Sequence, residues 1–187
     1  MRSEAMPEGL IAAGNSIIVL GEAGTGKTDL AVAVHEEMSG EYQSAIATYK
    51  GSLKKFFIAI AMQLGCPTED ENDKAMTVDA LKEEILVNSG EDTLLIFPEA
   101  KRLTTSIRYW LEDMISAGAR VVCFAVANPG KDIFLDMLEI ELDLPSDRHI
   151  REVMEVEAQN WRGDNSAKQY PVYVSSPSNP FDKMAVY

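Results

Sequence analysis

A glycine-rich turn between an apolar run and a helix constrains this chain more than any other feature. The apolar run is Ser16–Leu20, and the helix is predicted over Thr28–Met38. The turn reads GEAGTGKT over residues 21–28 and matches the phosphate-loop pattern G-x-x-x-x-G-K-[ST]. A short, almost continuous apolar run is typical of a central parallel strand, so the pattern predicts an α/β fold built around this turn.

Each part of the turn has a physical role in holding a phosphate. Gly21, Gly24 and Gly26 lack a Cβ and tolerate positive φ, so successive backbone N–H groups can turn inward around an anion. The helix that follows adds unpaired N–H donors and the positive end of its dipole. Lys27 is expected to reach the β- and γ-phosphates, and the Thr28 hydroxyl to ligate Mg²⁺. The predicted nucleoside-triphosphate site comprises Gly21, Glu22, Ala23, Gly24, Thr25, Gly26, Lys27, Thr28 and Asp29.

The charge balance limits the partners that the chain can have. It has 30 acidic and 17 basic residues, for a net charge of −13. Proteins bind nucleic acid by neutralising its phosphates with Lys and Arg, so we do not expect nucleic acid as the main partner. Basic spots at Lys54–Lys55 and at Lys101–Arg102 with Arg108 keep a DNA contact open. A protein partner or self-assembly is expected instead.

Other compositional features point to a protein of the cytoplasm. No apolar run approaches the roughly 18 residues that would span a bilayer, and the N-terminal residues lack a signal-peptide pattern. Cys66 and Cys123 have no metal-type spacing, so both are expected to be reduced thiols, with Cys123 buried in a strand.

Strand-like and helix-like segments alternate along the rest of the chain. Further strands are predicted at 44–49, 93–97, 120–127 and 140–144, with amphipathic helices between them and a short helix at 131–138. Thr77 is expected to cap one of these helices. This order predicts a P-loop NTPase three-layer sandwich, with a five-stranded, mainly parallel sheet covered by helices on both faces.

The predicted core spans residues 1–160 and includes a last helix that runs to about Gln159. Residues 161–187 are rich in Ser, Pro, Asn and Tyr without a helical period. This tail is expected either to be disordered or to dock its aromatic side chains on the core.

Two polar residues follow predicted strands and are candidates for catalysis. Hydrolysis of a bound triphosphate needs groups that position water and stabilise charge, and such groups lie at the carboxyl ends of parallel strands. The third strand ends in Phe97-Pro98-Glu99, which makes Glu99 the candidate acid. The fourth ends near Asn128, whose amide could sense the γ-phosphate or hold the water. A solvated strand-end acid at Glu99 and an Asn-Pro turn at Asn128 remain open as alternatives.

Four segments resemble those of AAA-type ATPases, and the nearest branch is the bacterial group of secretion and transposition-helper ATPases. In chain order they are similar to Walker A, Walker B, sensor-1 and the fifth strand: LGEAGTGKTDLA, LLIFPEA, VVCFAVANPG and ELDLPSDRHIREVMEVEA. The resemblance covers roughly Gly9 to Gln159. It implies ATP and Mg²⁺ as ligands, Glu99 as the residue that activates water, and Asn128 as sensor-1.

The chain departs from the family pattern at three places. Pro98 stands where the family has the aspartate that supports Mg²⁺. Leu138-Glu139 stands where the family tends to have an arginine that completes a neighbouring subunit's site. The chain also leaves the pattern at about Asn160, before the family's helical lid. We therefore expect an ATP-binding protein with slow or partner-dependent hydrolysis.

Two other functions remain open. The first is a non-hydrolysing adaptor, in which ATP sets the conformation offered to another protein. The second is a small-molecule P-loop kinase, which is less favoured because no arginine-rich lid segment occurs between the later strands.

Overall fold

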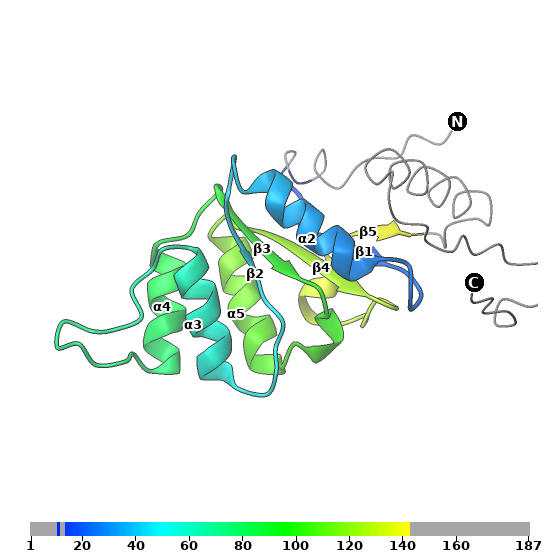
Figure 1. Cartoon of the computed structure of the whole chain (residues 1–187). Coiled ribbons are helices and arrows are strands. Elements are labelled where there is room, and N and C mark those ends of the chain that lie inside the picture. The colour runs from blue at the N-terminus through cyan, green and yellow to red at the C-terminus, as the bar shows by residue number, and fades with distance from the viewer. Residues whose placement is uncertain (1–10, 12–13, 143–187) are drawn as a thin grey trace, which may run out of the picture. The chain divides into compact units, whose positions relative to one another are not determined.

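The computed structural model describes Ile11 and residues 14–142, which form a parallel sheet with helices on both faces (Figure 1). The strands pair in the order β2-β3-β4-β1-β5, and every pairing is parallel. Their bounds are β1 Ile17–Leu20, β2 Gln43–Ile46, β3 Thr93–Phe97, β4 Arg120–Ala125 and β5 Leu138–Glu141. The helices are α2 Lys27–Met38, α3 Leu53–Gln63, α4 Val78–Val87 and α5 Thr105–Ser116, with 3₁₀ helices η1 Ala100–Arg102 and η2 Asp132–Leu135.

The inner strands β1, β3 and β4 are almost entirely apolar because both faces of the sheet are covered there. Successive side chains of a strand point to opposite faces. Ile17 and Val19 therefore pack in one cluster with Val34 of α2, while Ile18 packs in a second cluster with α3 and α5. Figure 1 shows α2 apart from the group formed by α3, α4 and α5. The predicted three-layer P-loop NTPase fold is confirmed, with a sheet that is parallel from edge to edge.

Aromatic side chains hold the larger helical layer on the sheet. The Phe57 ring of α3 lies edge-on to the Trp110 ring of α5, with 4.9 Å between ring centroids. Phe56, the residue before Phe57, stacks on Phe97 at the end of β3, with 6.0 Å between ring centroids. α4 packs against α3, and its first turn is capped by the Thr77 hydroxyl, as predicted, which accepts a hydrogen bond from the Ala80 N–H. Cys123 is fully buried in β4, as predicted, and burial raises the pKa of its thiol far above the usual range.

The predicted bounds need correction at the later end of the described chain. The segment predicted as a helix at 131–138 contains only η2, which begins at Asp132 with φ of 52° and an ion pair from Arg108 Nε, 2.5 Å away. β5 starts at Leu138, two residues before the predicted start. The Leu138 N–H donates to the Ser16 carbonyl, and from this residue on β5 pairs with β1. β2 is also shorter than predicted and ends at Ile46.

Several predictions concern residues outside the described part. These are the last helix toward Gln159 and the tail at 161–187, so the boundary between core and tail stays a prediction. Of the segment before β1, Ile11 is buried in the same cluster as α2. Within the described residues, none of the helices has the length and apolar character needed to cross a membrane.

Candidate nucleotide-binding site

A cleft of about 800 Å³ opens at the carboxyl ends of β1, β4 and β3. Three chain segments line it. The phosphate loop and the start of α2 contribute Ala23, Gly24, Gly26, Lys27, Thr28 and Asp29. The turn after β3 contributes Pro98, Glu99, Lys101 and Arg102, and the end of β4 contributes Phe124, Ala125 and Val126. The topology therefore brings the predicted phosphate loop and Glu99 to one cleft.

The glycines of the loop are required for two different reasons. Gly24 and Gly26 have φ of 88° and 78°, where a residue with a Cβ is strained, although space around both is open. Gly21 is needed because its backbone passes close to other groups: a Cβ there would lie 2.7 Å from Thr25 Oγ1. The Gly21 N–H donates to the Ala125 carbonyl at 3.1 Å, which ties the loop to the end of β4.

Replacing Gly21 by alanine is expected to destabilise the protein by about 1–3 kcal/mol, because the added methyl overpacks the turn against Thr25 and Leu142. Urea denaturation followed by circular dichroism measures the change. Gly40→Ala is the matched control, since a Cβ at Gly40 meets nothing within 4 Å and its φ is not positive. Equal stabilities of the two variants would contradict the close approach at Gly21.

The start of α2 differs from the starts of the other long helices. The first turns of α3, α4 and α5 are each capped by a hydroxyl, from Ser52, Thr77 and Thr104 respectively. α2 is preceded by Gly26 in the left-handed region, and a glycine has no side chain that can cap. The first N–H groups of α2 therefore face the cleft with the positive end of the helix dipole, which is the arrangement that binds an anion.

Lys27 lies inside the loop that it helps to form. Its Nζ donates to the carbonyl oxygens of Gly21 and Glu22, at 2.6 and 2.5 Å, and to Thr25 Oγ1 at 3.2 Å. These three oxygens use all three donors of the ammonium. The lysine charge is thus held at the start of α2, where it adds to the helix dipole.

Glu99 lies in the cleft, but its carboxylate has a partner. Oε2 of Glu99 forms an ion pair with Nε of Arg102, three residues further on in η1. Both side chains are substantially exposed. From the sequence alone, Lys101 and Arg102 are predicted only as a basic spot on the surface. The signal that could have placed them is their spacing: they follow a buried strand by four and five residues, and a tight turn keeps them at its carboxyl end.

Asn128 is not among the residues that line the cleft. Its Oδ1 accepts from the Gly130 N–H at 2.8 Å, and its Nδ2 donates to the Phe134 carbonyl and to Oε1 of Glu139. These contacts are those of a turn former that ties the end of β4 to η2 and β5. After β4, which ends at Ala125, the residue that lines the cleft is Val126, and it is 64% exposed.

The groups in the cleft fit a triphosphate that carries its own Mg²⁺. Thr28 lines the cleft and supplies a hydroxyl oxygen, whereas the Pro98 side chain has no ligand atom. In the described part of the chain, no group of three or more His, Cys, Asp or Glu side chains could hold a metal ion. Mg²⁺ in such sites keeps several waters and binds phosphate oxygens, so Thr28 alone is compatible with it.

Comparison with known proteins supports the fold. No family model matches the chain, and no curated protein matches it. It is similar to the structure of Drosophila ORC bound to DNA, with 15% identity and a TM-score of 0.56 over 79% of this chain and 42% of that one. It is also similar to Cdc6p from Pyrobaculum aerophilum, with 16% identity and a TM-score of 0.56 over 78% of this chain and 43% of that one.

The matched region is less than half of either solved chain. At this identity the likeness concerns the fold alone. The chain therefore has the P-loop NTPase fold, and it is structurally similar to Drosophila ORC and to Cdc6p from Pyrobaculum aerophilum.

Proposed function

We propose that this chain is an ATP-binding, AAA-type P-loop protein whose own hydrolysis is slow or depends on a partner. The observation that carries the proposal is the start of α2: an uncapped helix N-terminus, a positive-φ glycine turn and the Lys27 ammonium meet in one cleft. Together they supply oriented N–H donors and positive charge for a polyphosphate. The resemblance to the secretion and transposition-helper branch is part of the same proposal.

The reason to propose slow hydrolysis is the surroundings of Glu99. Its carboxylate is engaged by Arg102, and Pro98 cannot support the metal. An arginine finger can raise the rate of phosphoryl transfer by 10³-fold or more. The segment from Asp132 to Glu141, which includes β5 and the residues before it, contains no arginine that could act in this way on a neighbouring copy.

Calorimetry with Mg-ATP and a steady-state hydrolysis assay test the proposal. We expect saturable binding of one nucleotide per chain, and turnover far below the roughly 10 s⁻¹ that is typical of enzymes. Glu99→Gln is expected to remove any residual hydrolysis while binding persists. Absence of binding would overturn the proposal, and a fast rate abolished by Glu99→Gln would overturn its claim of slow turnover.

A non-hydrolysing adaptor is the second candidate, and the Glu99–Arg102 ion pair beside Pro98 favours it. Light scattering with a non-hydrolysable ATP analogue, together with a hydrolysis assay with ATP, separates the two. Assembly accompanied by turnover supports the ATPase, whereas tight binding by a permanent monomer supports the adaptor. Because the ORC structure contains DNA, the measurement is repeated with a DNA duplex, for which the net charge of −13 predicts weak binding.

A further inference from the structure

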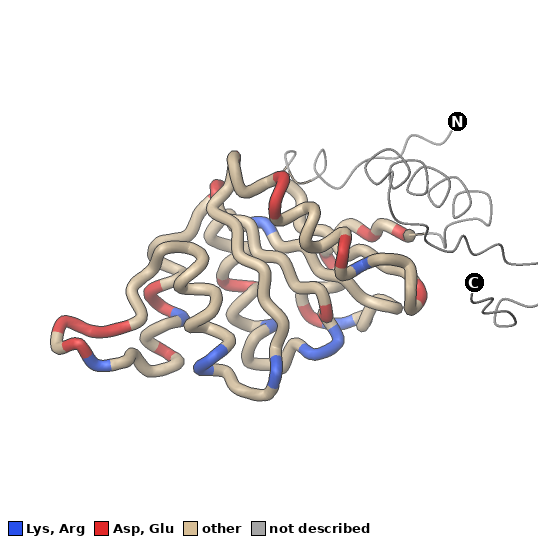
Figure 2. Tube along the Cα trace, in the orientation of Figure 1, with Lys and Arg blue, Asp and Glu red and all other residues tan. Residues whose placement is uncertain are grey.

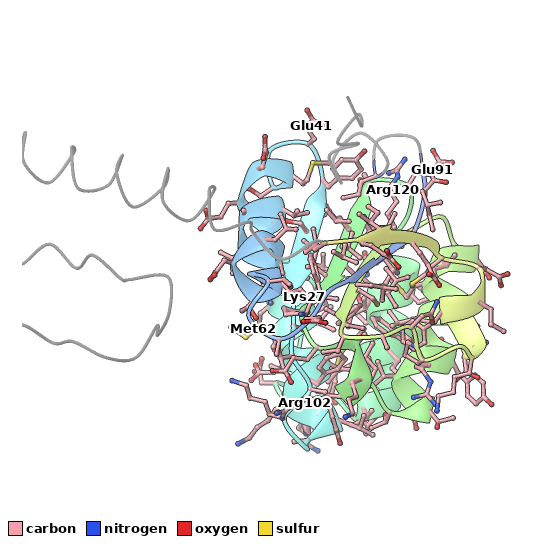
Figure 3. All side chains as sticks on the ribbon, turned by 90° about the vertical axis from the view of Figure 1, so that its right-hand side faces the viewer. Lys27, Glu41, Met62, Glu91, Arg102 and Arg120 are labelled. Carbon is pink, nitrogen blue, oxygen red and sulfur yellow. The ribbon has the colours of Figure 1, made fainter. Side chains whose placement is uncertain are left out.

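Opposite charges meet at the β3 side of the cleft. Figure 3 shows Arg102 at the lower end of the domain and Lys27 above it, near mid-height, with Glu91 and Arg120 near the upper end. Lys27 and Arg102 both line the cleft, from β1–α2 and η1 respectively. In Figure 2, several basic positions lie along the lower edge of the domain. Besides Lys27, the cleft thus has two cations on the side of β3, Lys101 and Arg102, and among the described residues the ion pair of Arg102 is with Glu99.

The ion pair between Glu99 and Arg102 is easy to exchange. The side chains are 45% and 58% exposed, and pairs between such exposed groups contribute little to stability. A terminal phosphate carries more negative charge than a carboxylate and offers several oxygens to the planar fork of a guanidinium. A phosphate that enters the cleft can therefore replace Glu99 as the partner of Arg102.

The sheet order determines which phosphate Arg102 could meet. β4 lies between β1 and β3, so the carboxyl ends of β1 and β3 are separated by roughly 10 Å. The loop with Lys27 follows β1, and the turn with Arg102 follows β3. The phosphates nearest the ribose are expected to occupy the loop and the start of α2. The terminal phosphate is the group that would project across the end of β4 toward η1.

We propose that Arg102 binds the γ-phosphate of ATP and that this contact releases the Glu99 carboxylate. The inference rests on the proposed ATP-binding function. ADP lacks the phosphate that competes for Arg102, so the Glu99–Arg102 pair persists with ADP bound. The turn after β3 therefore distinguishes the triphosphate from the diphosphate, and Glu99 becomes free to orient water only when a γ-phosphate is present.

Calorimetry with Mg-ADP and with the Mg complex of a non-hydrolysable ATP analogue tests the assignment. Arg102→Gln is expected to weaken binding of the analogue roughly tenfold and of ADP less than twofold, because only the analogue loses a charge-assisted contact. Arg102→Lys keeps the charge without the fork and is expected to fall between. Lys101→Gln removes a neighbouring charge from the same cleft, and we expect equal, smaller effects on both nucleotides.

Variants of Glu99 provide the second part of the calorimetric test. Glu99→Gln frees Arg102 and is expected to strengthen binding of the analogue several-fold, and this gain should largely disappear in Glu99→Gln/Arg102→Gln. Equal losses for both nucleotides in Arg102→Gln, or an undiminished gain in the double variant, would overturn the role of Arg102 alone. If wild type binds neither nucleotide, the proposed function fails and the role of Arg102 fails with it.

Discussion

Replacing Lys27 by alanine is expected to weaken Mg-ATP binding at least a hundredfold, the largest effect on binding of any single change in the chain. The Lys27 ammonium is fixed by Gly21, Glu22 and Thr25 beside the first N–H groups of α2. Its loss removes about 3 kcal/mol of charge-assisted interaction with a bound phosphate. Isothermal titration calorimetry measures the change directly.

The same substitution should leave the fold nearly as stable as before. The Glu22 carbonyl is exposed, and the Gly21 carbonyl and the Thr25 hydroxyl are only half-buried, so water can replace the lysine as their donor. Lys55→Ala is the control: Lys55 is exposed at the start of α3 and does not line the cleft, so binding should change less than twofold. ATP binding that survives in Lys27→Ala would mean that the phosphate loop is not the binding site.

The sequence predicted best those elements whose residues are specified by local rules. β3 is predicted at 93–97 and occupies Thr93–Phe97, because a strand covered on both faces is a nearly continuous apolar run, here Leu94 to Phe97. The cap at Thr77 was likewise predictable, since a hydroxyl before an amphipathic stretch satisfies the first free N–H groups of a helix. The positive φ of Gly24 and Gly26 in the loop belongs to the same class, because glycine adopts this conformation without strain.

The features that the sequence could not predict depend on contacts between distant segments. β5 is an edge strand with exposed residues, so hydrophobic periodicity does not mark its first residue. Its start is set by the Ser16 carbonyl, more than a hundred positions away in the chain. The partner of Asn128 is also distant, because Glu139 reaches it only once β5 has paired with β1. The pairing of Glu99 with Arg102 was missed because an acid and a base three residues apart are too common to indicate a contact.

Stability and nucleotide binding depend on different parts of the fold. The aromatic cluster of α3 and α5 packs on the face opposite α2, and its central ring, Phe57, does not line the cleft. Of the residues that hold Lys27, Glu22 is exposed and Gly21 and Thr25 are half-buried, and none of them belongs to the buried core. A core substitution should therefore lower the free energy of unfolding without altering the site itself.

Phe57→Ala is expected to lower the free energy of unfolding by about 3–5 kcal/mol, the largest stability loss among the predictions made here. Phe57 is fully buried, packs edge-on against Phe56 and Trp110, and lies 5.4 Å from Lys82 Nζ. Truncation removes its burial and leaves a cavity that the surrounding rings cannot fill. Urea denaturation followed by circular dichroism measures the loss. Met62→Ala is the matched control on the same helix, because Met62 is 69% exposed and its truncation should cost less than about 0.5 kcal/mol.

Mg-ATP should restore part of the stability that Phe57→Ala loses, if the core around Phe57 and the cleft are independent of each other. A ligand that binds only the folded state stabilises it by about 2.7 kcal/mol at a concentration of one hundred times Kd. The gain with Mg-ATP should therefore be the same in wild type and Phe57→Ala, and it should vanish in both when Lys27 is also replaced by alanine. A smaller gain in Phe57→Ala alone would show that packing of α3 against α5 reaches the cleft, since the cavity would then change the affinity as well as the stability.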